Sequence, residues 1–408
     1  MLLETPQGGA LPPLLMPGGV MTPSTPDYGG STRPARRMPP PTPEAPRFLF
    51  AVDGIRYEAV RELARMQTGE RLMLARRRQE ADNTVSGFCF VRRLPNPSTY
   101  LRRKRLVEEV QLAFRLNHPG IAQIYFRKVH EDFLHVVMEH VDGPSLETLV
   151  SAGVARGRPV SEAFGLYVGA ELAEALHHAH MLTDGEGRPL GIIHRDVNPR
   201  HVYVGAHGGV KLTNFGAAYS VMVGREESPM NLVRGDVAYA SPEYLEKQPL
   251  SPRSDVFSVG VLLVELLTGK HLFDVQDVRF ASTGLAPLRI EILPSLPLTQ
   301  MRILLARFSP ADVEAAVAGL SPDVKALLHT ALRADPTERF ATAADLCGAL
   351  RTALAKRHPG YGRHEASEEV ATVLAEGSCL RDVVEFGEGG LFPEGLEEHE
   401  FGGPPPRK

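Results

Sequence analysis

The spacing of apolar residues changes from a strand period to a helix period near Asp142-Gly143-Pro144. Before this point, one segment (98–116) has helical spacing and four others have the short apolar pattern of strands. The predicted strands are 70–78, 87–94, 121–129 and 133–139. The predicted helices after it are 161–181, 254–268, 321–334 and 341–356. A small sheet-rich part followed by a larger helical part predicts an α+β fold with two lobes.

The two ends of the chain differ in composition from this central part. Residues 1–47 contain twelve prolines and many glycines, and such a segment buries too little apolar surface to offset its ordering entropy. We therefore predict a disordered leader over 1–47. Between His364 and Glu400, eleven acidic residues stand against one arginine, with several glycines between them. We predict that residues 358–408 form a second mobile tail, which is acidic and rich in glycine.

Charge and cysteine content exclude several classes of partner. The net charge of -4 gives no bulk attraction to nucleic acid or to an anionic membrane. Three widely spaced cysteines indicate neither a disulfide framework nor a metal knuckle, and they are typical of a reduced, cytoplasmic protein. The longest apolar stretch, 256–267, is short for a membrane span and contains Glu265. We expect a cytoplasmic protein without nucleic-acid or membrane partners.

Two short polar groups carry the functional signal of the chain. His194-Arg195-Asp196 is followed by Asn198 and His201, and Asn214-Phe215-Gly216 comes a few residues later. A neutral imidazole is a poor ligand for magnesium, and an amide oxygen coordinates a metal without a formal charge. Among these side chains only Asp196 carries a carboxylate, whereas a magnesium site normally has more than one negatively charged ligand.

The block resembles the catalytic and metal-binding loops of protein kinases, in which His-Arg-Asp, four residues and Asn are followed by Asp-Phe-Gly. Six segments match that family in its order and near its spacing, at 118–121, 136–143, 190–196, 241–243, 255–260 and 335–340. The sequence of residues 188–216 is most similar to those of bacterial, especially myxobacterial, serine/threonine kinases. The likeness spans about residues 57–356 and identifies the chain as a degenerate member of that family.

The resemblance implies a bilobal kinase-like domain over 48–357. It comprises a β-rich small lobe (about 48–138), a hinge (about 139–143) and a larger helical lobe (about 144–357). The positions that hold this fold in the family are His194, Arg195, Phe215, Gly216, Glu243, Asp255 and Arg339. Among these, the family pairs the arginine at 339 with the glutamate at 243. All seven are kept in this sequence.

The positions that bind nucleotide in the family are altered here. Gly69 is the one glycine kept from the glycine-rich loop, and the segment is better interpreted as an ordinary hairpin. Phe90 stands where a small residue faces adenine, so its ring is expected to fill that position. Arg92 replaces the phosphate-binding lysine, and we expect a structural ion pair with Glu109. The hinge contributes Met138 as gatekeeper, Glu139 and Val141.

The catalytic and metal-binding positions are also changed. Asp196 keeps the residue that accepts the substrate hydroxyl proton in the family, whereas Asn198 replaces the catalytic-loop lysine. His201 and Asn214 replace the two metal ligands, an asparagine and an aspartate. A unit charge about 4 Å from a cation contributes roughly 4 kcal/mol at an effective dielectric near 20, so the loss at 214 would weaken metal binding greatly.

Three functions are consistent with this pattern. The leading hypothesis is a pseudokinase that binds a protein partner, such as another kinase, without phosphotransfer and without a cofactor. The first alternative is an active serine/threonine kinase that uses ATP with magnesium or manganese at an unusual metal site. The second is a nucleotide-binding switch without catalysis, in which the ligand shifts the closure of the lobes. The sequence names neither the partner nor the oligomeric state.

Overall fold

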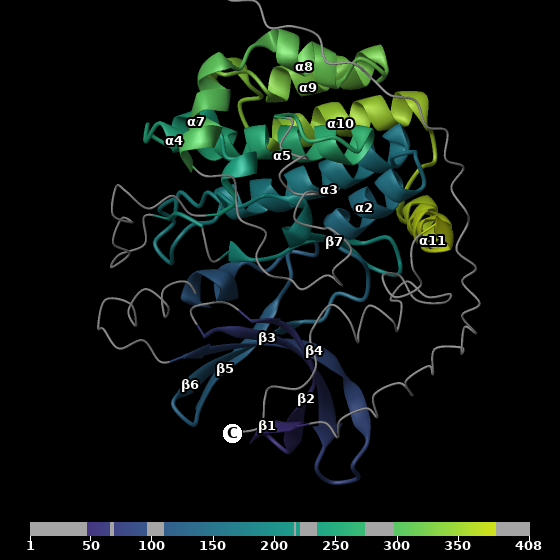
Figure 1. Ribbon diagram of the computed structural model, residues 1–408. Helices are drawn as coiled ribbons and strands as arrows, with labels where there is room; N and C mark the ends of the chain where they lie inside the picture. The colour runs from purple at the N-terminus through teal and green to yellow at the C-terminus, as the bar shows by residue number, and fades with distance from the viewer. Residues whose placement is uncertain are drawn as a thin grey trace, which may run out of the picture. The chain divides into compact units, whose positions relative to one another are not determined.

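The computed structural model describes residues 47–65, 69–95, 110–215, 218–220, 235–273 and 298–380. The described residues belong to one compact unit that begins after Pro43. The predicted leader, apart from Arg47, and residues 381–408 of the predicted tail lie outside these ranges, as do Glu109 and Gly216. The predicted α+β fold with a sheet-bearing lobe and a helical lobe is confirmed (Figure 1).

The N-lobe holds a six-stranded sheet in the order β1-β2-β3-β4-β6-β5, with every neighbouring pair antiparallel. The strands are β1 (Arg47–Val52), β2 (Ile55–Arg65), β3 (Arg71–Gln79), β4 (Val85–Pro95), β5 (Ile124–His130) and β6 (Phe133–Glu139). The four predicted strands correspond to β3 to β6. Strands β1 and β2 were not predicted; they are joined by Asp53-Gly54, both with positive φ. Asp-Gly at such a two-residue turn is a strong hairpin signal.

The N-lobe sheet curls so that its two edge strands approach each other. The ring of Phe50 on β1 lies 5.1 Å from His135 on β6 and 6.4 Å from Phe126 on β5. Tyr57 on β2 reaches Phe126 as well, with 5.4 Å between ring centroids. The inside of the curl is an apolar core made by Phe50, Tyr57, Met73, Ala75, Cys89, Val91 and Val137. The right-handed twist of a sheet makes such curling possible.

Helices form most of the C-lobe. They are α2 (Leu146–Ala155), α3 (Glu162–His180), α4 (Pro242–Leu245), α5 (Pro252–Thr268), α7 (Leu298–Arg307), α8 (Pro310–Ala316), α9 (Pro322–Ala331) and α10 (Ala343–Arg357). Ser161 and Thr342 cap α3 and α10 with their hydroxyl groups, which satisfies main-chain N–H groups at these helix starts. Figure 1 shows α3, α5 and α10 side by side, and their buried faces form one core with α9. The four helices predicted for this lobe are confirmed as α3, α5, α9 and α10.

A short two-stranded sheet, β7 (Val202–Val204) and β8 (Val210–Leu212), follows the loop that carries the candidate site. An isolated bridge joins Ile121 to Leu212, and the N–H of Ala122 donates to the carbonyl of Leu212 at 2.9 Å. These contacts tie the segment before β5 to the strand that leads into Asn214.

The prediction of a mobile tail from residue 358 is wrong for its first part. Arg363–Leu380 forms helix α11, which packs against α2 and α3 through a fully buried stripe (Figure 1). That stripe consists of Ala366, Val370, Val373 and Leu374. The acidic residues that suggested a solvated tail are its anchors, because Glu369 accepts from Ser161 and Glu376 pairs with Arg156 at 2.7 Å. Helical spacing in 366–374 was the missed signal.

Across the described part of the chain, none of the helices is both long and apolar enough to cross a membrane.

Candidate functional site

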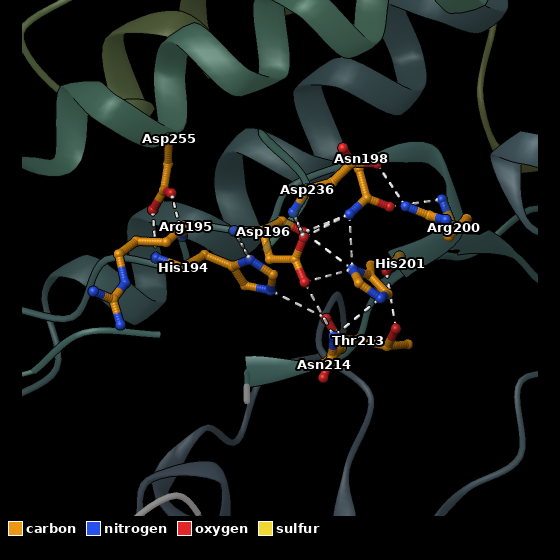
Figure 2. A network of polar contacts seen from close by, with 10 residues as sticks. All are labelled: His194, Arg195, Asp196, Asn198, Arg200, His201, Thr213, Asn214, Asp236 and Asp255. Atoms are coloured by element: carbon orange, nitrogen blue, oxygen red, sulfur yellow. Dashed lines mark hydrogen bonds and ion pairs between the residues drawn. The ribbon is translucent and has the colours of Figure 1, made fainter. Parts of the chain in front are cut away.

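Asp255, at the start of α5, fixes the beginning of the loop 194–201. Its carboxylate accepts the main-chain N–H groups of His194 at 2.8 Å and Arg195 at 3.0 Å (Figure 2). It also contacts Nε2 of His180, at the end of α3, at 2.8 Å. Burial raises the pKa of Asp255, but the hydrogen bond and charge of His180, together with the hydrogen bond from the main-chain N–H of Arg195, outweigh it, so the pKa lies below its ordinary value. Arg195 is held at φ 65, a strained value for a non-glycine residue.

His194 links this anchor to the strand that leads into Asn214. Its ring is fully buried, and burial lowers its pKa, so the imidazole is neutral. Nδ1 accepts the main-chain N–H of Asp196 at 3.2 Å, and Nε2 donates to the carbonyl of Thr213 at 3.1 Å. The ring also packs edge-on against Phe215, with centroids 4.5 Å apart. The predicted fold-holding residues His194, Arg195, Asp255 and Phe215 therefore form one connected unit.

The carboxylate of Asp196 is surrounded by donors from its own chain. Oδ1 accepts from Nδ2 of Asn198 at 2.8 Å and from the main-chain N–H of Asp236 at 2.9 Å. Oδ2 accepts from Nδ2 of Asn214 at 3.3 Å and lies 3.4 Å from Nδ1 of His201 (Figure 2). Only 8% of Asp196 is exposed. Both oxygens that a substrate hydroxyl or a metal would approach are thus already engaged.

His201 and Asn214, the two residues predicted to stand at metal-ligand positions, contact each other. Nδ2 of Asn214 lies 3.0 Å from Nε2 of His201, and the same amide nitrogen donates to Asp196. Nδ1 of His201 lies 3.1 Å from the main-chain oxygen of Asp196. Asn214 has φ 62, and an asparagine tolerates this left-handed backbone better than most residues. The side of Asn214 that meets Asp196 presents N–H groups, which repel a cation.

No three histidine, cysteine, aspartate or glutamate side chains gather closely enough to hold a metal ion in the described ranges. The nearest approximation is Asp196 with His201 and the amide of Asn214. This donor set supplies one carboxylate, whereas magnesium in proteins prefers several oxygen ligands. The residues present fit magnesium poorly.

Phe90, which the sequence predicts to stand at the adenine position, lies beside the hinge. The ring of Phe90 is half-buried and packs edge-on against His140, with 5.0 Å between centroids, and Phe88 meets the same imidazole at 5.9 Å. Phe90 lies opposite Met138 in the pairing of β4 with β6. Burial lowers the pKa of His140, so this ring is neutral at pH 7. Three rings and a methionine therefore occupy the sheet end of the hinge.

Arg92 is engaged with a residue of the neighbouring strand segment. Its Nη2 lies 2.9 Å from Oε2 of Glu70, directly after Gly69. Gly69 has φ 83, a conformation that favours glycine. The expected partner Glu109 lies outside the described residues. The ion pair with Glu109 therefore stays a prediction, and the Glu70–Arg92 ion pair ties the start of β3 to β4.

The hinge is held by a lysine that the sequence analysis missed. Nζ of Lys211 on β8 lies 2.7 Å from Oε1 of Glu139, whose other oxygen accepts the main-chain N–H of Gln123 at 3.0 Å. Val141 is buried in the hinge. No sequence spacing links Lys211 to Glu139, since the pair arises from the contact between β8 and the hinge.

Arg200 and Asp236 complete the surroundings of Asp196. Their side chains form an ion pair of 2.5 Å, and Asp236 also donates its main-chain N–H to Asp196. Gly235, at φ 78, permits this approach, because a side chain there would meet the main chain of Arg195. The residues that close over Asp196 thus come from a segment forty residues later in the chain.

The expected ion pair between Glu243 and Arg339 is present and buried. Nη1 and Nη2 of Arg339 each lie 2.8 Å from the carboxylate oxygens of Glu243. Burial raises the pKa of Glu243, but hydrogen bonds and charge from Arg339 outweigh it, and the pKa lies below its ordinary value. Ser254 at the start of α5 donates to the same carboxylate. This pair connects α4 to the segment before α10.

A curled N-lobe sheet, a hinge, a helical C-lobe and a loop with a buried aspartate define a protein of the kinase type. The sequence model of the protein kinase domain matches residues 90–349, and the chain belongs to that family. It is 32% identical over 270 residues to the serine/threonine-protein kinase PknB of Mycobacterium tuberculosis, covering 65% of this chain and 37% of PknB.

Two further relatives have similar sequence identity to this chain. The chain is 29% identical over 258 residues to the serine/threonine-protein kinase PrkC of Bacillus subtilis, covering 63% of this chain and 34% of PrkC. It is 29% identical over 265 residues to the tyrosine-protein kinase MasK of Myxococcus xanthus, covering 62% of this chain and 36% of MasK. The chain thus spans little more than a third of the length of these relatives. They support the expected bacterial protein kinase family.

Proposed function

We propose that this chain is a pseudokinase, a degenerate kinase-family protein that acts in signalling by binding a protein partner in the cytoplasm and transfers no phosphate. The observation that carries the proposal is the closed hydrogen-bond network of Asp196, Asn198, His201 and Asn214. In this network the side chains at the metal positions bind one another and the retained aspartate.

Phosphoryl transfer depends on positioning and on electrostatic stabilisation of a charged triphosphate. Metal ions supply much of that stabilisation, and they need negative oxygen ligands. Asn214 has no formal charge, and its amide nitrogen faces Asp196 at 3.3 Å. A metal could bind here only after the amide turned over and released both Asp196 and His201. The free energy of those contacts opposes metal binding.

The place of adenine supports the same proposal. Phe90 and Phe88 each pack against His140 where the hinge meets the sheet. A nucleotide base would have to displace rings that contact this imidazole, and the half-buried Phe90 would lose apolar contacts. The phosphate-binding cation is also committed, because Arg92 forms an ion pair with Glu70.

The test is a thermal-unfolding titration of the full chain with ATP, carried out with magnesium, with manganese and without metal. A ligand that binds the native state raises the unfolding midpoint by mass action. We expect no rise up to millimolar ATP in any of the three conditions. Phosphotransfer that is lost in Asp196→Asn would overturn the proposal. A control titration on an active relative such as PknB verifies that the assay detects nucleotide.

The second candidate is an active kinase with an atypical metal site, which uses ATP with magnesium or manganese. The assembled loop favours it, because Asp255 positions His194 and Arg195 and thereby orients Asp196. His201 offers an imidazole that suits manganese better than magnesium. This candidate requires a midpoint rise with manganese and phosphotransfer that depends on Asp196. A rise with ATP that is independent of metal and unaccompanied by phosphotransfer would instead indicate a non-catalytic nucleotide switch.

A further inference from the structure

On the N-lobe sheet, three arginines surround a single glutamate, and we call these three residues the arginine cluster. Arg56, Arg76 and Arg78 all approach the carboxylate of Glu58, at 3.8, 2.7 and 3.4 Å. Glu58 is 7% exposed, and burial opposes its ionisation, but hydrogen bonds and charge from Arg76 and Arg78 hold its pKa below the ordinary value. Three guanidinium groups around one carboxylate leave a net charge of about +2.

The register of the sheet places apolar side chains at both ends of this cluster. Phe48, Glu58, Arg76 and Phe88 lie opposite one another across β1, β2, β3 and β4, so their side chains share one face of the sheet. In the next row, Arg56 lies opposite Arg78, which lies opposite Val85. Phe48, Phe88 and Val85 are between 45% and 47% exposed. This face therefore suits a segment with both acidic and apolar side chains.

The arginine cluster lies on a face that reaches the hinge. Phe88, which is paired with Arg76, contacts the ring of His140, and β6 ends at Glu139 directly before it. Helix α2 begins soon after the hinge, at Leu146. The hinge thus lies between the arginine cluster and the start of α2.

Helix α11 runs along α2 toward this hinge. Glu369 contacts Ser161, which lies after the end of α2, whereas Gly377 packs against Ala152, inside α2. The direction of α11 is therefore opposite to that of α2, and Figure 1 shows the two helices as neighbours. Ala152 lies six residues from Leu146, about 9 Å along the helix axis. The chain leaves α11 on the hinge side of the C-lobe.

Residues 381–400, which follow α11, have the matching chemistry. They contain seven acidic residues and one arginine, with apolar residues spaced among them. The acidic residues are Asp382, Glu385, Glu388, Glu394, Glu397, Glu398 and Glu400. Twenty extended residues span up to about 65 Å, which is ample for a path past the hinge to the sheet.

We propose that residues 381–400 dock in cis on the arginine cluster of the N-lobe sheet, with their carboxylates on Arg56, Arg76 and Arg78 and their apolar side chains on Phe48, Phe88 and Val85. The docked segment would bridge the two lobes across the hinge. This proposal goes beyond the proposed function and does not depend on whether the chain transfers phosphate.

The test is a spin-label distance measurement on the full chain, with labels at Val129→Cys, on β5 and outside the proposed site, and at Glu398→Cys. Cys379→Ser removes the third cysteine of the chain. Cys89 and Cys347 are buried and stay unlabelled. We expect a narrow distance distribution at low salt. It should broaden at 1 M salt, where the screening length falls to about 3 Å.

Charge variants separate docking from general electrostatics. Replacing Glu385, Glu388 and Glu394 by glutamine should abolish the narrow peak. A matched control replaces three exposed acids of the C-lobe, at Glu246, Glu338 and Glu368, and should leave the peak in place. Both triple variants change the net charge equally. A third charge variant, Arg56→Gln, leaves Glu58 with its two closer arginines and should weaken the peak without unfolding the sheet.

Three outcomes overturn the proposal. A broad distribution in the chain with unaltered charges, or a peak that survives both high salt and the three glutamines, shows that the segment does not dock on the arginine cluster. Loss of the peak on dilution with unlabelled chain shows that the segment binds a second copy instead.

Discussion

Nδ2 of Asn214 lies 3.0 Å from Nε2 of His201, and because an amide nitrogen is a donor, this ring nitrogen accepts from it. Nδ1 of the same ring lies 3.0 Å from Nδ2 of Asn198 and 3.1 Å from the main-chain oxygen of Asp196. Both ring nitrogens of His201 are therefore engaged within the loop. The two residues predicted to stand at metal-ligand positions thus contact each other.

Restoring the charged ligand at 214 should make the protein sensitive to metal. In Asn214→Asp, a carboxylate replaces the donor that lies 3.3 Å from Oδ2 of Asp196. Two like charges about 4 Å apart repel by roughly 4 kcal/mol at an effective dielectric near 20, so we expect a loss of stability of a few kcal/mol without metal. Magnesium or manganese should restore much of it, as measured by thermal unfolding with and without each ion.

The matched control for this prediction is Asn214→Ala, which removes the same hydrogen bonds without adding charge. It should lose stability by about 1–2 kcal/mol and gain nothing from metal. Equal metal responses of the aspartate and alanine variants would contradict the account of the closed network.

Truncation of Phe90 should open the adenine position. Phe90→Ala removes a half-buried ring that packs on His140. We expect a loss of about 1–3 kcal/mol, below the range for fully buried phenylalanines. Nucleotide binding, followed by calorimetric titration with ADP, should rise above that of the unaltered chain. A wild-type chain that binds ADP as tightly as the variant would show that the ring does not block the site; Phe88→Ala, at the exposed neighbour, serves as the comparison.

The buried ion pair of Glu243 and Arg339 should cause much of the loss of folding stability below pH 4.5. Arg339→Met leaves a buried carboxylate unpaired and should cost about 3–5 kcal/mol. The folded-state pKa of Glu243 is lowered from 4.5, so its contribution is fully present above that pH and is lost as pH falls through the folded value. Urea unfolding of Glu243→Gln between pH 7 and 3 should therefore show a flatter decline below pH 4.5 than the unaltered chain. Parallel curves would contradict this assignment.

His135 should make stability depend on pH in a higher range. Burial, with charge from Arg93 and His130, lowers its pKa from 6.5 to about 4, and Nδ1 has no hydrogen-bond partner. The unfolded chain therefore binds a proton between these two values while the folded chain does not. Stability is complete above pH 6.5 and falls as pH drops toward 4, by on the order of 3 kcal/mol. His135→Phe should remove this slope in urea unfolding, whereas a replacement of exposed His364 should not.

Helix α11 should contribute to the stability of the C-lobe although it lies beyond the matched domain, 90–349. Val373→Asp places a charge in its fully buried face against α2. We expect a loss of several kcal/mol or detachment of the helix, seen as faster hydrogen exchange in 363–377. Ala371→Asp adds the same charge at an exposed position of the same helix. If both variants exchange alike, α11 does not pack as described.

The sequence determined the class of fold because its signals are local or carry their own period. The alternation in β3, β4 and β6 and the apolar spacing of α3 and α5 were readable without tertiary contacts. The replacements at Asn198, His201 and Asn214 were equally visible, since each stands at a fixed place in a short motif. The tail over 358–380 was misjudged, because acidic residues were taken as solvated when they pair with Arg156 and Ser161.

Only the tertiary structure decided which of these residues meet. Asp236 reaches Asp196 from forty positions away, and Lys211 reaches Glu139 from seventy-two. No periodicity encodes such contacts, because they depend on how loops and strands far apart in the chain are brought together by the packing of a common core. The sequence by itself predicted that His201 and Asn214 replace metal ligands, and the tertiary structure determined that these two residues contact each other.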